Sequence, residues 1–315
     1  MVSYILQLNL NNDYLLIYLM GKISKDKRDI YYRLAKQMGY RSRSAFKLLQ
    51  VDNYFNIFSN VKTIVDLCAA PGGWSQVASQ KLKDVPNKKI ISIDLQQFAP
   101  IEGVNIIIGD ITNQLKLQEI MTLANKEPID LVICDGAPDV TGFNEFDVYI
   151  QFQLVLTALN TSIRMLKTGG NFVTKLFKGK YTDIIIQIFL ICFDKVTITK
   201  PKACRNASFE SFVMCEGFKE DNEIIKKLRH SELNENDIIQ LNSLRLVKDD
   251  DEEEEFNYEK YNVKFIQVGD DEYDSDKTYD LESTNYEKVL NPVQMPIDPP
   301  YKYYIDNLKG KQINK

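Results

Sequence analysis

The chain has 315 residues, 44% of them hydrophobic, and a formal net charge of −5 at pH 7. This length can hold one large domain or two small ones around a substantial core. Residues 1–19 contain no Lys or Arg and are interrupted by Asn and Asp, which excludes a secretory signal and a clean membrane span. The single histidine, His230, lies outside the motif-rich region, which excludes a Ser-His-Asp triad there and argues against a histidine-bound metal.

The average charge conceals two parts of opposite sign. Residues 1–218 carry 25 Lys and Arg against 20 Asp and Glu, whereas residues 219–315 carry 14 against 24. Nine basic residues lie between Lys22 and Lys47, which suits contact with RNA phosphates, although a solvated helical face would show the same pattern. The five cysteines lack C-x-x-C spacing, which indicates buried thiols in a reducing cytosol and no disulfide or zinc site.

The N-terminal part is predicted to contain an extension and a basic helical region. We expect residues 1–19 to be disordered or an artefact of the gene model. Residues 24–56 are predicted to be helical, and Lys47 would point toward the ligand edge of the sheet that follows. The candidate RNA contacts are Lys25, Lys27, Arg28, Arg33, Arg41 and Arg43, with Arg205 further along the chain.

The segment TIVDLCAAPGGWSQ, residues 63–76, predicts a buried strand that turns sharply into a helix. Small residues at such a turn let the backbone approach a ligand, and the free N–H groups of the new helix favour an anion. Neither the G-x-G-x-x-G fingerprint nor the G-x-x-x-x-G-K-[ST] phosphate loop occurs in the sequence. The turn therefore indicates a nucleotide-type ligand site of another class.

Strands that alternate with helices predict a doubly wound, mostly parallel α/β sheet of seven strands. The strands are expected at 62–67, 89–94, 104–108, 130–135, 170–176, 194–199 and 209–215, and the helices at 74–83, 114–125, 146–167 and 182–192. Gly169-Gly170 is expected to end the third of these helices before the fifth strand. Carboxylates at the strand ends, Asp66, Asp94, Asp110 and Asp135, could accept hydrogen bonds from ribose hydroxyls or an adenine amino group.

The pattern becomes weaker after Gly217, so we predict one domain over residues 20–218 and an acidic, partly disordered tail over residues 219–315. One or two helices are expected within 223–246, and the seven consecutive acids at 249–255 are expected to be disordered. The stretch from Phe256 onward is either a solubilising tail or a segment that folds onto RNA or a partner.

The motif D-L-C-A-A-P-G-G-W-S-Q, with D-G-A-P-D-V-T-G at residues 135–142, resembles the FtsJ-like family of S-adenosylmethionine-dependent RNA ribose 2′-O-methyltransferases. Residues 20–49 and 200–212 resemble the eukaryotic subgroup that modifies the tRNA anticodon loop. The resemblance covers residues 20–217, with weaker similarity at 273–279 and 296–302. It implies a Rossmann-like methyltransferase fold, S-adenosyl-L-methionine as cofactor, and 2′-O-methylation of tRNA at positions 32 and 34.

The family uses a Lys-Asp-Lys-Glu tetrad, and the resemblance implies Lys47, Asp135, Lys175 and Glu210 in these roles. Lys175, in the apolar run NFVTKLF, would be the general base, with a pKa lowered by burial or by the second cation, Lys47. A purely structural lysine that reaches the surface is the alternative. The resemblance implies a site that needs no metal. The implied cofactor contacts are Asp66, Gly72, Gly73, Trp74, Asp94, Asp110 and Asp135.

Three readings of the function remain open from the sequence. The leading one is tRNA methylation in the cytoplasm, assisted by a large helical-repeat protein and a WD40-type propeller protein that the subgroup resemblance implies. The second is the same chemistry on ribosomal RNA or an mRNA cap. The third is a catalytically inactive RNA-binding scaffold, against which the complete tetrad and glycine turn argue.

Overall fold

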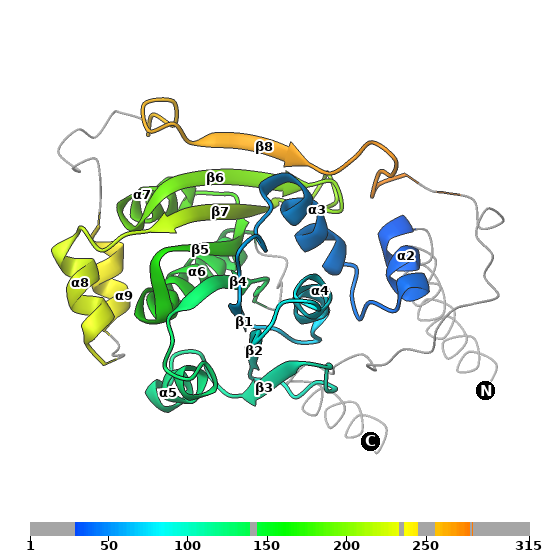
Figure 1. Cartoon of the computed structure of the whole chain (residues 1–315). Helices are drawn as coiled ribbons and strands as arrows, with labels where there is room; N and C mark the ends of the chain where they lie inside the picture. The colour runs from blue at the N-terminus through cyan, green and yellow to red at the C-terminus, as the bar shows by residue number, and fades with distance from the viewer. Residues whose placement is uncertain (1–28, 139–143, 233–235, 245–255, 278, 280–315) are drawn as a thin grey trace, which may run out of the picture.

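The computed structural model describes residues 29–138, 144–232, 236–244, 256–277 and 279. Its centre is one sheet of eight strands in the order β3-β2-β1-β4-β5-β7-β6-β8 (Figure 1). The strands are β1 Thr63–Leu67, β2 Lys89–Asp94, β3 Val104–Ile108, β4 Ile129–Cys134, β5 Leu166–Phe177, β6 Phe193–Pro201, β7 Glu210–Phe218 and β8 Lys264–Val268. The helices are α2 Ile30–Met38, α3 Ala45–Phe55, α4 Gly73–Lys81, α5 Gln114–Leu123, α6 Asn144–Met165, α7 Thr182–Cys192, α8 Glu223–His230 and α9 Asn236–Asn242.

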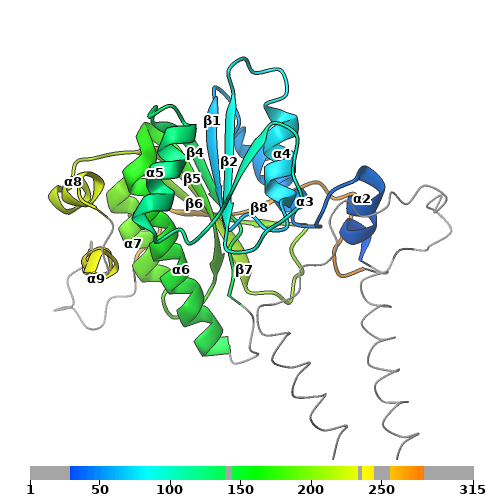
Figure 2. The same ribbon diagram turned by 90° about the horizontal axis from the view of Figure 1, so that it is seen from below.

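Helices cover both faces of the sheet, as Figure 2 shows, with α5, α6 and α7 on one face and α3 and α4 on the other. Two apolar clusters fill the spaces between these layers. Five of the strand pairings are parallel, and the two antiparallel ones are both made by β7. The predicted mostly parallel α/β fold is confirmed.

The basic region that we predicted as helical contains two helices in its described part. Asp29 caps α2 by accepting a hydrogen bond from the Tyr32 amide at 3.2 Å. Gly39 ends the helix with φ = 76°, a left-handed conformation that favours glycine. The chain then turns and begins α3 at Ala45. Residues 24–28 lie outside the described residues.

The fifth strand starts earlier than predicted, because the helix before it ends at Met165 and not at the glycine pair. Leu166 already pairs with Ile129 of β4, and the register then shifts so that Asn171 pairs with Leu131. Gly169, with φ = 80°, lies at this shift. A side chain at Gly170 would come within 2.9 Å of the Lys167 carbonyl oxygen. The two glycines therefore form an irregularity inside β5 and do not stop a helix.

The sheet has eight strands where we predicted seven. The additional strand, β8, pairs in parallel with β6 from Thr197–Lys264 to Pro201–Val268. Its sequence KFIQV is mostly exposed, so it lacks the apolar run by which the other strands are recognised. The predicted boundary at residue 218 therefore divides elements that share one sheet. The acidic run at residues 249–255 lies outside the described residues.

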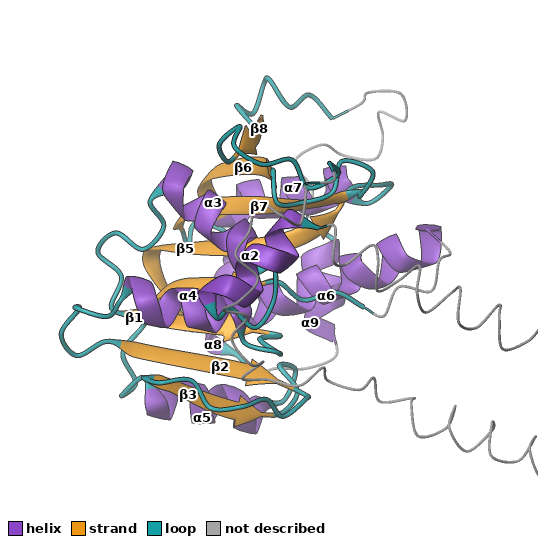
Figure 3. Ribbon diagram, turned by 90° about the vertical axis from the view of Figure 1, so that its right-hand side faces the viewer, coloured by secondary structure: helices purple, strands orange, loops and turns teal. Residues whose placement is uncertain are grey.

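The strands β1, β2, β3, β4 and β5 run parallel to one another and present their carboxyl ends at one edge, and Figure 3 shows α6 extending beyond that edge. This is the edge at which ligands bind in sheets of this kind. No helix among the described residues combines the length and the apolar character needed to cross a membrane.

Candidate active site

A lysine and an aspartate meet at the carboxyl ends of β4 and β5. Lys175 lies near the end of β5, and Asp135 directly follows β4, its parallel neighbour. Lys175 Nζ lies 2.6 Å from Asp135 Oδ1 and donates a hydrogen bond to the Asp135 carbonyl oxygen at 2.8 Å. The two side chains are only 9% and 17% exposed. Because little water surrounds the two side chains, their electrostatic interaction is stronger than it would be at the surface.

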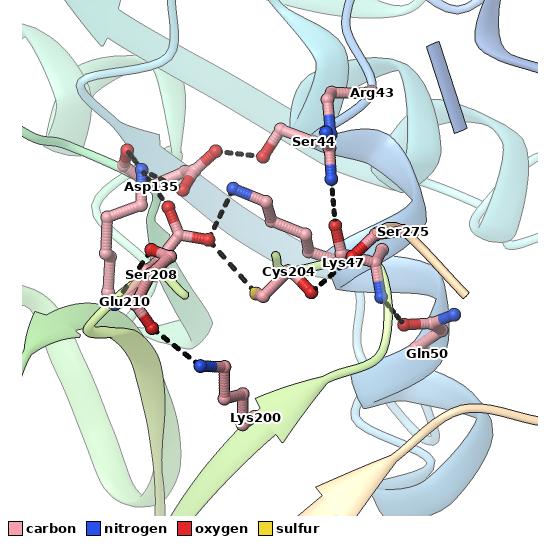
Figure 4. Close-up of polar contacts among 12 residues, drawn as sticks. Arg43, Ser44, Lys47, Gln50, Asp135, Lys200, Cys204, Ser208, Glu210 and Ser275 are labelled. Atoms are coloured by element: carbon pink, nitrogen blue, oxygen red, sulfur yellow. Dashed lines mark hydrogen bonds and ion pairs between the residues drawn. The ribbon is translucent and has the colours of Figure 1, made fainter. Parts of the chain in front are cut away.

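Glu210 and Lys47 complete a cluster of four charges. Glu210 begins β7 and lies opposite Phe177 of β5, whereas Lys47 comes from the first turn of α3. Lys47 Nζ is 2.6 Å from Glu210 Oε1, and Lys175 Nζ is 3.7 Å from Glu210 Oε2. Figure 4 shows Lys47, Asp135 and Glu210 converging from separate elements. The structure thus brings together all four residues that the sequence predicted as catalytic.

The ion pairs within the cluster determine the pKa values of Glu210 and Lys175. Burial alone would raise the pKa of Glu210, but Lys47 and then Lys175 lower it to about 2. Burial alone would lower the pKa of Lys175, but Asp135 and then Glu210 raise it above its ordinary value. We had expected a lowered pKa for Lys175, and this direction is wrong for the protein without ligands, because two carboxylates outweigh the effect of burial. Lys175 is therefore an ammonium ion at neutral pH in this state.

The pairing of Glu210 predicts a loss of stability in acid. The pKa of Glu210 is about 2 in the folded protein against an ordinary value of 4.5, so its contribution is present above pH 4.5 and is lost as the pH falls toward 2. We expect this group to account for about 2 kcal/mol of the stability lost between about pH 5 and pH 3. Urea unfolding at both pH values should therefore show a smaller loss for Glu210→Gln. An equally large change in Glu127→Gln, whose carboxylate is 65% exposed, would contradict this account.

Ser44 links the cluster to the glycine turn, although no motif in the sequence pointed to this residue. Its hydroxyl hydrogen-bonds Asp135 Oδ2, on the oxygen that does not face Lys175. The indole N–H of Trp74 donates to the carbonyl and hydroxyl oxygens of Ser44 at 3.0 and 3.1 Å. Ser44 lies at the start of α3, whose first turn also carries Lys47. The start of α3 therefore contacts Asp135 through Ser44 and Glu210 through Lys47 (Figure 4).

A second layer of contacts fixes Glu210 from outside. The Cys204 thiol donates to Glu210 Oε1 at 3.0 Å, and the Ser208 hydroxyl accepts a hydrogen bond from the Glu210 amide at 3.1 Å. Ser275, from the segment after β8, donates to the Cys204 carbonyl at 2.7 Å (Figure 4). Lys200 donates to the Ser208 carbonyl at 2.6 Å. The C-terminal segment thus supports the loop that carries Glu210. All five cysteines of the chain are free thiols, and all but Cys68 are buried.

The glycine turn has the sharp strand-to-helix geometry that the motif predicts. Gly72 precedes α4 with φ = 99°, and a side chain at Gly73 would collide with Ser42. The Trp74 ring packs 5.5 Å from that of Phe212. Asp66 is buried, accepts a hydrogen bond from the Ser75 hydroxyl at 2.6 Å, and has a pKa raised by burial. Asp66 and Trp74 therefore shape the turn from inside.

The other two predicted cofactor carboxylates lie at the ends of β2 and β3, which are neighbours in the sheet. Asp94 accepts hydrogen bonds from the amides of Ala70 and Gln96 at 2.9 and 2.8 Å. Asp110 accepts from the amide and hydroxyl of Thr112, both at 2.8 Å. Because a carboxylate can accept about four hydrogen bonds, both groups keep acceptor capacity toward the edge. Such acceptors suit the hydroxyl and amino groups of an adenosyl ligand.

The predicted RNA contacts have mixed positions. Arg33 is 3% exposed and donates to the Tyr279 carbonyl at 3.3 Å, so it does not fit a phosphate contact, because its charge is turned inward. Arg41 donates to the carbonyls of residues 71, 99 and 100, and Arg43 pairs with Asp29. The Arg205 side chain is 40% exposed and lies 3.5 Å from Asp29. Lys25, Lys27 and Arg28 lie outside the described residues.

Known proteins resemble this chain along most of its sequence. The profile of the FtsJ-like methyltransferase family matches residues 40–218. The tRNA (cytidine(32)/guanosine(34)-2′-O)-methyltransferase of Mus musculus is 44% identical over 303 residues, which is 94% of this chain and 89% of the mouse protein. The enzyme of the same name from Schizosaccharomyces pombe is 41% identical over 94% of this chain and 100% of its own length.

A solved structure supports the same grouping. The crystal structure of a Plasmodium falciparum protein assigned as a ribosomal RNA methyltransferase is 27% identical to this chain, with a TM-score of 0.52. It covers 57% of this chain and 98% of its own length. The shared part is thus about the size of the predicted domain.

Proposed function

Because this chain belongs to the FtsJ-like methyltransferase family, we propose that it transfers a methyl group to ribose 2′-hydroxyls in the anticodon loop of tRNA, at positions 32 and 34. The observation that carries the chemistry is the buried cluster in which Lys175 Nζ lies 2.6 Å from Asp135 and 3.7 Å from Glu210. The choice of tRNA is supported by two relatives of that name that match 94% of the chain, including its C-terminal part.

S-adenosyl-L-methionine, when bound, would supply a methyl group through cleavage of its bond to the sulfonium sulfur and would leave as a neutral thioether. The enzyme's task is therefore to align and deprotonate the poorer partner, the hydroxyl. We propose that Lys175 takes the 2′-hydroxyl proton as the oxygen–carbon bond forms. Asp135 and Glu210 hold its amine in place, and Lys47 adds a second positive charge. Lys175 has to lose its own proton first, and exclusion of water together with the added charge of a sulfonium would lower its pKa.

The cofactor assignment predicts a separable defect at Asp94. We expect Asp94→Ala to weaken binding of S-adenosylmethionine at least tenfold, because hydrogen bonds to a charged group contribute about 1.5–3 kcal/mol each. The rate at saturating cofactor should change less. Isothermal calorimetry on the purified protein measures the affinity. Asp94→Asn is the matched control, because it keeps an acceptor for the Ala70 amide while removing the charge. Unchanged affinity in both variants would exclude Asp94 as a cofactor contact.

Ribosomal RNA is the alternative substrate, because the Plasmodium falciparum neighbour is assigned to that substrate and shares the fold. The charged cluster alone does not distinguish the two RNAs. The deciding experiment is to map ribose methylation on total tRNA and rRNA after depletion of this protein. We expect loss at tRNA positions 32 and 34, with rRNA unaffected. Loss confined to rRNA would overturn the tRNA assignment, and no loss in either would revive the inactive-scaffold reading.

We also propose a cytoplasmic location and two helper proteins, one with helical repeats and one with a WD40-type propeller. The free cysteines support a reducing compartment. The helper proteins rest on the subgroup resemblance of residues 20–49 and 200–212. Co-purification from cells under native conditions tests the two helper proteins. Recovery of the chain with neither helper type would argue against them.

A further inference from the structure

Exposed aromatic side chains gather beside the active site on elements that the mechanism does not use. Phe146 and Tyr149, on the first turns of α6, are 55% and 42% exposed. Phe265, on β8, is 52% exposed. Large apolar side chains at the surface of a ligand edge are informative, because most such residues are buried in the core.

Two exposed lysines lie in a turn that packs against the start of α6. Lys178 and Lys180 occupy the turn between β5 and α7, immediately after the strand that carries Lys175. Lys178 Nζ lies 4.6 Å from the centre of the Phe265 ring. Among the described residues, neither lysine forms an ion pair with a carboxylate. Partial burial and then the neighbouring Lys200 lower the pKa of Lys178.

The turn and the helix are packed together as one surface. A side chain at Gly179 would come within 2.9 Å of Val148 on α6, so the turn lies directly against the start of that helix. The Tyr149 and Tyr181 rings are 5.7 Å apart. We call the surface formed by Phe146, Tyr149, Lys178, Lys180 and Phe265 the basic–aromatic ledge.

The ledge is physically tied to the catalytic cluster. Gln151, two residues after Tyr149, donates hydrogen bonds to the carbonyls of Gly136 and Lys175 at 3.1 and 3.2 Å. The amide of Lys178 donates to the Phe209 carbonyl at 2.9 Å, next to Glu210. The elements that bear the ledge therefore border the residues that would activate the ribose.

Exposed aromatic rings next to exposed lysines are suited to one class of ligand. Unpaired nucleotides stack their bases on exposed aromatic rings, while the intervening phosphates contact cations. A duplex keeps its bases stacked on one another and offers only phosphates. The exposed carboxylate of Glu145, at the start of α6, disfavours phosphate at that end, so phosphates are expected on the lysine side.

We propose that the basic–aromatic ledge binds the unpaired nucleotides next to the target ribose, with bases on Phe146 and Tyr149 and phosphates on Lys178 and Lys180. This proposal rests on the proposed RNA methyltransferase function and deepens it. It assigns the preference for a loop over a stem to this chain itself.

The test is equilibrium binding of two fluorescent RNA probes to the full chain, followed by anisotropy. One probe is a hairpin with an anticodon-type loop, and the other is a continuous duplex of equal length. We expect Phe146→Ala/Tyr149→Ala to weaken hairpin binding at least about thirtyfold and to leave duplex binding unchanged. Lys178→Ala/Lys180→Ala should weaken the binding of both probes. It should also reduce the slope of log K against log salt concentration for hairpin binding by about 0.7 per lysine. Tyr54→Ala, also an exposed aromatic at 57%, and Lys83→Ala are the matched controls.

Circular dichroism should first show that each variant is folded. Hairpin binding by the aromatic variant that equals the wild type overturns the proposal, as does an equal loss on hairpin and duplex. These outcomes are independent of catalysis. Wild-type protein that binds the hairpin through the ledge but methylates no RNA would instead overturn the proposed function and leave the ledge standing.

Discussion

Lys175→Ala is expected to lose at least about a thousandfold in methyl-transfer rate, because it removes the only amine in contact with both Asp135 and Glu210 among the described residues. General-base catalysis typically contributes about 10²–10⁴-fold, and the lost ion pair also releases the two carboxylates that orient the cluster. Cofactor binding should stay within about threefold of the wild type, because the predicted adenosyl contacts Asp94 and Asp110 lie at the ends of β2 and β3. Single-turnover rates with labelled S-adenosylmethionine, together with calorimetry, measure the two quantities separately.

Lys175→Arg separates the role of the base from that of the cation. A guanidinium keeps a positive charge beside Asp135 but cannot lose a proton at accessible pH. We therefore expect this variant to fold and bind cofactor normally and to be nearly as inactive as Lys175→Ala. Lys195→Ala, which removes a 53% exposed lysine of β6, should keep full activity. Substantial turnover by Lys175→Arg would show that another group takes the proton and that Lys175 acts by charge alone.

The catalytic cluster could be predicted because each member lies in a local pattern that constrains its place. Lys175 interrupts an apolar strand and Asp135 ends one, so parallel pairing of β4 and β5 brings them together. The protonation of Lys175 could not be predicted in the same way. Its pKa depends on the balance between burial and two carboxylates, which only the three-dimensional distances decide.

Other features of the structure could not be predicted from sequence patterns. Ser44 is one of several small residues before α3, and its importance comes from a contact with Asp135, 91 positions away in the chain. β8 escaped prediction because an edge strand that is mostly exposed shows no apolar run. Arg33 was misjudged for the opposite reason, since a basic residue in a basic region resembles a surface contact although the fold buries it.

α9 falls within residues 223–246, where we predicted one or two helices, but its docking on α6 was not predicted. Arg164 of α6 and Asp237 of α9 form an ion pair at 2.7 Å, with side chains only 2% and 1% exposed. We expect Asp237→Ala to lower the free energy of unfolding by about 3–5 kcal/mol, because it leaves the Arg164 guanidinium buried without its carboxylate. Urea unfolding measures this value. Glu216→Ala removes a surface partner of Lys195 and should cost no more than about 1 kcal/mol.

This stability effect should be separable from catalysis, because Arg164 and Asp237 lie on the side of α6 that packs against α8 and α9, whereas the charged cluster lies at the carboxyl ends of β4 and β5. At a temperature where Asp237→Ala remains folded, its methyl-transfer rate should therefore equal that of the wild type. A stable Asp237→Ala variant would show that the buried pair is energetically neutral. A folded variant with a reduced rate would show instead that residues beyond 218 couple to the active site through α6, whose Gln151 bonds to the backbone of Lys175.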